Sequence, residues 1–456
     1  SANIAVMING VPVNDMEWGG VYWSNWAGLS DVTRSMQTQR GMGASKISSP
    51  SVGGTINIVT NTIDAKKGGT VSYGIGNDGA NTMSASFSTG LMENGWAMSV
   101  LLAKRWGDGY IQGTGYTGYN WFVNVSKRLS SKHQLSLTAF GAPQKHNQRK
   151  PLYAGLSIEE WDKVAQWTGE KDKYRYNAVY GFDNNGKERS SMVNEYHKPQ
   201  ISLNHQWQID HKSSLSTALY VSIGRGSGYS GQGRTSADRA MWNGSSNGKL
   251  LYNFRKSDGT FDYGAIQDMN AASLDGSRMV MSKSINNHMW YGLLSTYTNE
   301  ILPGLELSAG VDVRYYVGEH TNEIIDLYDG AYFIDDGDRK NVKVENNIAA
   351  ADPNWKYEKL GVGDVVYRDY DGHVHQEGAF AQLEWTKNKV NAFVSGSVSN
   401  TGYWRVDRFY YDAAHQRSET MNFVGFTAKA GANWNFTKSS NLFLNVGYIS
   451  RAPFFS

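Results

Sequence analysis

The sequence has no cysteine, only 8 prolines among 456 residues, and no unbroken apolar stretch of about 18 residues. The lack of cysteine excludes disulfides, thiol catalysis and cysteine-ligated zinc. The lack of a long apolar stretch excludes a transmembrane helix. The formal net charge is only +2, so the chain as a whole is not strongly attracted to nucleic acid, and we expect no nucleic-acid partner.

Glycine and aromatic residues are abundant instead. The chain contains 50 glycines, 27 tyrosines and 15 tryptophans, which suits many strands, tight turns and rings of aromatic side chains at a membrane interface. The mean hydropathy is −0.50, a value typical of soluble proteins. A transmembrane barrel can also have such a value, because only alternate residues face lipid and its outer loops are polar.

From residue 68 onward, apolar and polar residues alternate with the period of a β-strand. The segment 305–314 shows this most clearly. One of its faces has Leu305, Leu307, Ala309, Val311 and Val313, and the other has Glu306, Ser308, Gly310, Asp312 and Arg314. Full charges in the middle of the polar face indicate a wet lumen rather than a protein core.

The alternating segments and their connections predict the fold class. Several segments reach the length that a tilted strand needs to cross a bilayer. About thirteen strands are expected, near residues 69–77, 81–91, 96–105, 119–129, 133–142, 198–209, 215–225, 288–300, 305–317, 376–387, 389–399, 422–437 and 441–450. Short turns alternate with long connections at 105–118, 143–197, 226–287, 318–375 and 400–421. This alternation is typical of membrane barrels, so we predict an all-β, transmembrane antiparallel β-barrel.

The first 67 residues follow a different pattern. Residues 4–12 predict a strand that leads into a turn, and residues 29–36 predict a short helix with Ser30 as its N-cap. Two glycine-rich motifs follow, at positions where glycine suits tight turns and close backbone packing. The motif residues of this region are Asn9, Gly10, Pro12, Arg40, Gly41, Gly53, Gly54 and Asn57.

In order and spacing, these motifs resemble the plug domains of TonB-dependent outer-membrane receptors, particularly those of Bacteroidetes-type bacteria. Such plugs have a strand ending in an Asp-Gly-Val-Pro-like turn, then an Arg-Gly pair, then a closing Gly-Gly-x-Ile-Asn-Ile-x-Thr segment before the first barrel strand. The resemblance covers the whole chain. It implies a barrel of about 22 strands around an α+β plug, with residues 1–67 in the plug and residues 68–456 in the barrel.

The resemblance also implies a location, partners and a division of the full protein. The location is the outer membrane of a Gram-negative cell. The expected partners are membrane lipids, a nutrient ligand, a TonB-type energy-coupling protein of the inner membrane and a surface lipoprotein. The odd strand count predicts that several barrel strands lie outside this sequence. The resemblance implies that the N-terminal half of the plug and the C-terminal barrel strands do so. No cofactor is expected.

Catalytic motifs are not evident. The sequence has no nucleophile elbow, HExxH motif or P-loop. The acidic pairs at 159–160 and 335–336 are expected to be solvated loop residues, and a calcium loop at 335–338 lacks the distant glutamate that it needs. His373 and His375 share a strand face and could reach one metal ion, although a chance pair near an aqueous rim is the favoured interpretation. The chain is therefore not expected to be an enzyme.

Ligand capture is the functional hypothesis. In the family, outward-facing plug loops and barrel loops form the binding site, and here the segments 14–26 and 44–50 match two such loops. Aromatic rings give a large contact area and keep polar tips near water. The candidate ligand-binding residues are Asn14, Met16, Trp18, Tyr22, Trp23, Lys46 and Ser48, with Trp26 equally suited to packing against the barrel. The ligand classes considered are a ferric siderophore, haem, cobalamin, an oligosaccharide and a peptide.

Two alternatives from other classes remain open. A passive porin or an adhesin barrel shares the strand pattern, but a passive pore needs no N-terminal plug. A soluble all-β carbohydrate-binding protein or hydrolase would bury one face of each strand in a core, which charges such as Asp312 and Arg314 argue against. Three tryptophans near strand ends, Trp96, Trp121 and Trp290, are predicted to lie in the interfacial girdle.

Overall fold

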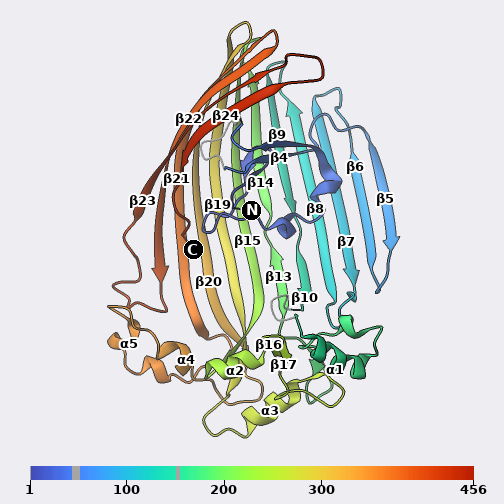
Figure 1. The fold of residues 1–456 in the computed structure, drawn as a ribbon, viewed down its shortest axis with the longest axis vertical. Helices are drawn as coiled ribbons and strands as arrows, with labels where there is room; N and C mark the ends of the chain where they lie inside the picture. The colour runs from blue at the N-terminus through green and yellow to red at the C-terminus, as the bar shows by residue number, and fades with distance from the viewer. Residues whose placement is uncertain (1, 44–51, 150–154, 456) are drawn as a thin grey trace.

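A computed structural model describes residues 2–43, 52–149 and 155–455. Two sheets dominate it. A four-stranded sheet near the N-terminus lies inside a curved wall, which is formed by a fifteen-stranded sheet (Figure 1). Hairpin turns lie at one end of the wall, and the longer connections with their helices lie at the other end. None of the helices among the described residues is long and apolar enough to cross a membrane.

The wall is antiparallel, and β5 and β24 are its edges within the described residues. Its strands are β5 (Gly68–Ile75), β6 (Asn81–Ser88), β7 (Trp96–Gly107), β8 (Tyr116–Arg128), β9 (His133–Gly141), β10 (Gln144–Asn147), β13 (Val193–His197), β14 (Gln200–Gln208), β15 (Ser213–Gly233), β19 (Met279–Leu302), β20 (Leu305–Asp326), β21 (Val365–Lys387), β22 (Val390–Asp407), β23 (Met421–Trp434) and β24 (Leu442–Ser450).

Two passes across the wall are each divided into two strands. β9 and β10 both pair with β8, and β13 and β14 both pair with β15. The breaks fall at Pro143 and Pro199, because proline has no N–H for the strand ladder. The fifteen strands therefore make thirteen passes, since two passes are split in two, and the expected number of strands is confirmed.

The two faces of the wall differ as the sequence pattern predicts. On β20, Val311 and Val313 are 50% and 51% exposed on the outer face. Asp312 and Arg314 are each 9% exposed and face the plug side, where they form an ion pair of 3.4 Å. The apolar face is thus the exposed one, which is the opposite of a soluble sandwich.

Several strands extend further than the sequence pattern indicates. β15, β19, β20 and β21 contain 21, 24, 22 and 23 residues. The flanks of the expected connections 226–287, 318–375 and 400–421 are therefore strand, and the predicted boundaries are wrong there. The reason is that apolar and polar residues no longer alternate regularly in these extensions, as in Met279-Val280-Met281, while the backbone ladder continues.

The long connections fold into a cap at one end of the wall (Figure 1). The Arg255 guanidinium joins two of them, since it donates to the carbonyls of Ala178 and Gly244 at 3.0 and 2.8 Å. Trp242 and Trp355 are buried in hydrophobic clusters of the cap and are not exposed on its surface. The cap elements are α1 (Ile158–Thr168), η4 (Lys173–Arg175), β11 (Gly181–Phe182), β12 (Glu188–Arg189), α2 (Ser236–Met241), β16 (Ser245–Ser246), β17 (Lys249–Leu250), β18 (Phe261–Asp262), α3 (Tyr263–Ala271), α4 (Asp336–Arg339), α5 (Ile348–Ala351) and η5 (Trp355–Tyr357).

The described residues before position 68 form what we call the plug segment. Its sheet has the order β2-β1-β4-β3, with β1 (Ala5–Ile8), β2 (Val11–Pro12), β3 (Thr33–Arg40) and β4 (Gly54–Thr60). Two 3-10 helices, η1 (Trp23–Trp26) and η2 (Leu29–Val32), follow β2. The predicted helix over 29–36 is wrong beyond Val32: a single 3-10 turn, preceded by the left-handed Gly28, leads into β3.

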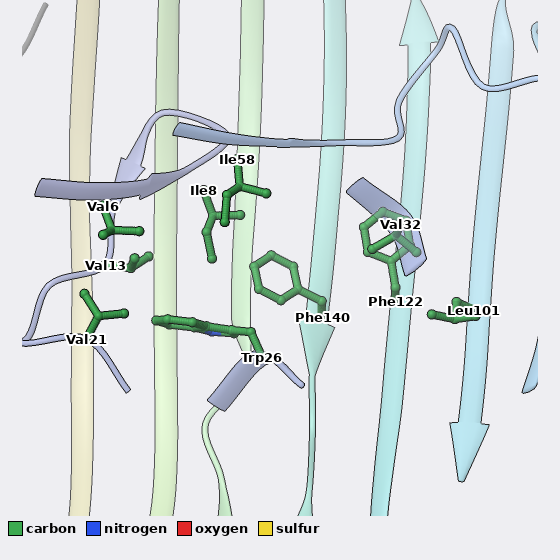
Figure 2. Close-up of a cluster of buried hydrophobic side chains, with 10 residues drawn as sticks. All are labelled: Val6, Ile8, Val13, Val21, Trp26, Val32, Ile58, Leu101, Phe122 and Phe140. Atoms are coloured by element: carbon green, nitrogen blue, oxygen red, sulfur yellow. The ribbon is translucent and has the colours of Figure 1, made fainter. Parts of the chain in front are cut away.

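A hydrophobic cluster joins the plug segment to the wall (Figure 2). Figure 2 shows the plug strands crossing the wall strands, with Trp26 beside Phe140. The wall contributes Leu101, Phe122 and Phe140, which are 4%, 2% and 4% exposed. Burial of this apolar surface fixes the plug segment against β7, β8 and β9.

Candidate functional site

The family-like motif residues build the plug sheet itself. Asn9 and Gly10 have φ of +52° and +80°, as a two-residue type I′ hairpin turn requires between β1 and β2. The Asn9 side chain accepts from the Thr60 N–H at 2.9 Å, and the Gly10 N–H donates to Asn57 at 3.1 Å. These contacts fasten the turn to β4.

The other motif residues set the register of the plug strands. Pro12 is paired with Met7 in the β1–β2 hairpin. Arg40 and Gly54 are opposite each other across β3 and β4, and a Cβ on Gly54 would meet the Gln39 carbonyl. Gly41 donates to the Gly53 carbonyl at 3.3 Å. The motif therefore has a structural role.

A loop that we call the plug tip, residues 14–26, faces the cap end of the lumen. The Gln144 amide donates to the Ser24 carbonyl at 2.7 Å, from the strand that leads into the cap. The side chain of Asn14, a candidate ligand residue, holds the backbone of the plug segment together. It accepts from the Val6 N–H at 2.7 Å and donates to the Ile4 and Gly19 carbonyls at 2.9 Å each.

Met16 and Trp26 pack the plug tip against the wall. Met16 is 9% exposed and belongs to a second buried cluster that includes Trp290 and Tyr316 of the wall. Trp26 is 9% exposed, which decides between its two predicted roles in favour of packing. Trp290 is 8% exposed and faces the plug, so the prediction that it lies in the outer girdle is wrong. Its neighbour Met289 has the outward position on β19.

Three aromatic residues of the plug tip remain available to a ligand. Tyr22 and Trp23 are 50% and 48% exposed, and the half-buried Trp18 packs edge-on to Tyr22 with ring centroids 5.1 Å apart. The Lys198 ammonium lies 5.8 Å from the centre of the Tyr22 ring. The structure thus brings Trp18, Tyr22 and Trp23 together, whereas Lys46 and Ser48 of the second candidate loop lie outside the described residues.

Two carboxylates occupy the base of the plug tip. Glu17 is 5% exposed, and its two carboxylate oxygens lie 2.8 and 3.1 Å from the His320 Nε2. Asp15 accepts from the backbone N–H groups of Glu17 and Trp18 at 2.9 and 3.1 Å. Burial raises the pKa of both carboxyls, while the backbone hydrogen bonds to Asp15 and the His320 contact with Glu17 oppose that rise.

The other chemical candidates have structural partners. His373 stacks on Trp404 with centroids 4.8 Å apart, and His375 lies 2.6 Å from a Glu377 oxygen. Asp336 and Asp338 pair with Arg234 and Arg239, and Glu160 pairs with Lys163. Among the described residues, no three His, Asp or Glu side chains are grouped closely enough to hold a metal ion.

The sequence did not indicate a role for Glu17, His320 or Lys198, or for two strand glycines, Gly318 and Gly372, that lie near Glu17. Glu17 and His320 are far apart in the chain, as are Tyr22 and Lys198, so sequence spacing could not predict these contacts. One signal was present: Gly318 and Gly372 lie inside long strands, and glycine there often marks close approach of another group.

No protein-family model and no curated protein matches this sequence. Solved structures do match. The ferric citrate transporter FecA is 12% identical, with a TM-score of 0.62 over 98% of this chain and 54% of its own. The ferric-catecholate import receptor Fiu of E. coli K12 is 11% identical, with a TM-score of 0.60 over 99% of this chain and 63% of its own. The chain has the fold of the TonB-dependent outer-membrane receptors.

A third match is the ferripyoverdine receptor of Pseudomonas aeruginosa, at 13% identity and a TM-score of 0.62 over 97% of this chain. The chain spans 50% of that receptor, so its length is about half of that structure. All three matches are transport proteins rather than enzymes. At this level of identity the likeness concerns the fold.

Proposed function

We propose that the protein is an active-transport receptor of the Gram-negative outer membrane. It binds a scarce nutrient at the plug tip and imports it to the periplasm when an inner-membrane TonB-type protein moves the plug. Residues 1–67 act as the plug unit and residues 68–456 as the barrel unit. The observation that carries this proposal is a folded plug segment packed inside the wall, with Tyr22 and Trp23 exposed at its tip.

The apolar outer face supports the membrane location. Val311 and Val313 on β20, and Val394 and Val398 on β22, are all about half exposed. Exposure of such apolar side chains to water is unfavourable, and lipid would remove that cost. A passive porin is the second candidate, and the plug segment argues against it because clusters of buried side chains hold that segment across the lumen. A soluble sugar-binding or hydrolytic protein is disfavoured by the same exposed face.

Uptake by cells that produce the full receptor tests the proposal. Labelled ferric citrate, haem, cyanocobalamin, maltoheptaose and a short peptide are supplied in turn. We expect one of them to accumulate above its external concentration, and to stop accumulating when the coupling protein is deleted. Equilibration of all five, unaffected by that deletion, would instead establish a passive pore.

Matched variants locate the site. Y22A and W23A are expected to reduce uptake of that ligand, because each removes an exposed ring at the plug tip. M36A is the control, since Met36 is 64% exposed on β3 and away from the tip. Equal uptake by all three variants would remove the plug tip from the binding site and leave the transport proposal to the other loops.

A further inference from the structure

A notch in the wall receives the Glu17 side chain. Gly318 on β20 and Gly372 on β21 are directly opposite each other in the ladder. A Cβ on Gly372 would lie 2.5 Å from the Glu17 Oε1, and a Cβ on Gly318 would also collide with that oxygen. Any other residue at either position would push the carboxylate out, so the two glycines create the space that it occupies.

Both ring nitrogens of His320 have hydrogen-bond partners. Its Nε2 faces Glu17 at 2.8 Å, and its Nδ1 faces the Asn286 Oδ1 at 2.8 Å. The amide oxygen can only accept, so Nδ1 has a hydrogen, whereas the Glu17 carboxyl can accept from Nε2 or donate to it. The Asn286 orientation agrees, because the same oxygen accepts from Arg368 at 3.3 Å. A shared hydrogen therefore joins the His320 Nε2 to the Glu17 carboxyl.

A second layer of polar contacts holds this pair in place. Arg368 donates to the Asn322 amide oxygen at 3.0 Å and to the Ser284 hydroxyl at 2.6 Å. The Tyr370 ring lies 4.8 Å from the His320 ring, centre to centre. The other titratable groups that face the pair are Asp15 and Tyr22 of the plug tip and Lys198, His288 and Tyr316 of the wall.

We propose that Glu17 and His320 are positioning residues that latch the plug tip to the wall. The latch holds the loop that presents Trp18, Tyr22 and Trp23. A role of the latch in ligand capture rests on the proposed function. The Glu17–His320 contact itself does not depend on that function. The latch joins residues 303 positions apart, at a point where two paired glycines leave space in the wall.

The buried Glu17 carboxyl makes the latch sensitive to pH. Burial raises the pKa of Glu17 above its usual range, so the docked plug tip holds the Glu17 proton more tightly than an undocked tip does. Docking of the plug tip should therefore be stronger at low pH and should weaken as the pH rises through the pKa of Glu17.

Hydrogen exchange in the full receptor, in lipid nanodiscs and without ligand, tests the latch. Protection of the amides in residues 15–20 is measured from pH 4 to 9 and corrected for the intrinsic rate. We expect protection in the wild type to fall as the pH rises, and H320Q to lose about tenfold or more of it because the contact with Glu17 is gone. E17Q should reduce the pH dependence, because the amide does not titrate.

The notch provides a second variant that changes no charge. G372A should displace the Glu17 carboxyl and reduce protection as H320Q does, while G396A on β22 is the control, because its new Cβ would come no nearer than 3.7 Å to another residue. Protection of β1 and β4 serves as the internal reference that the plug segment is still folded.

The outcomes separate the latch from the transport proposal. Identical pH profiles in the wild type, E17Q and H320Q, with β1 and β4 protected in all three, would overturn the latch. An unchanged profile in G372A would overturn the role of the notch. Neither result depends on a ligand, so failure of uptake with a normal latch profile would affect only the proposed function.

Discussion

Asp335 is a buried carboxyl in the connection between β20 and β21. It is 2% exposed and accepts from the Tyr367 N–H at 3.0 Å. Burial, and then the nearby charge of Asp338, raise the pKa of Asp335 to about 7. The folded cap therefore binds a proton, between the usual aspartate pKa and about pH 7, that the unfolded chain does not bind.

The stability that this proton gives is complete at pH 4 and is lost as the pH rises through 7. We predict that residues 333–340 exchange amide hydrogens more readily at pH 8 than at pH 5, after correction for the intrinsic rate. D335N should remove the pH dependence, because the amide is neutral throughout. E345Q, at an exposed position of the same connection, should keep it. Equal pH dependence in both variants would contradict the assignment.

The short helix η1 has one tryptophan that packs against the wall and one that is exposed. Trp23 and Trp26 are three positions apart, yet one is 48% exposed and the other 9% exposed beside Phe140. W26A should lower the free energy of plug unfolding by about 3–5 kcal/mol, because it leaves a cavity among large side chains. W23A should change it by less than about 0.5 kcal/mol.

Exchange protection of β1 and β4 measures this difference between the two tryptophan variants. The same experiments separate structure from function, since W23A is expected to lose ligand while keeping a stable plug segment. If W23A lost plug protection, or if W26A kept it, Trp26 would not be the tryptophan that packs the plug segment against the wall.

Over the whole molecule, the outer face of the wall should divide into a lipid-facing band and extensions in water. Val313 and Glu319 are on the same face of β20, six positions apart. V313R should reduce the stability of the barrel in lipid by about 2–4 kcal/mol, because it places a charge near the bilayer centre. E319R should have little effect. Urea unfolding in vesicles checks this, and equal midpoints for the two variants would place both residues in water.

Much of this architecture was predictable from residues alone. The alternation at 305–314 predicted both faces of β20, and residues 4–12 predicted a strand that leads into a turn, because strand period and turn chemistry are local properties. The strand ends at Gly233 and Asp326 were not predictable, since beyond the apolar band neither face differs from the other. Trp290 was placed on the wrong face because its position near a strand end resembles that of a girdle residue.

In the candidate site, too, local features were predictable from the sequence and long-range contacts were not. The sequence by itself determined a β-barrel pattern, a plug-like start and an aromatic segment at 14–26, all of which depend on neighbouring residues. Only the tertiary structure decided that Asn14, Met16 and Trp26 fix the loop while Tyr22 and Trp23 stay exposed. It alone brought Glu17 to His320, because contacts across 303 positions depend on how the plug segment sits in the wall.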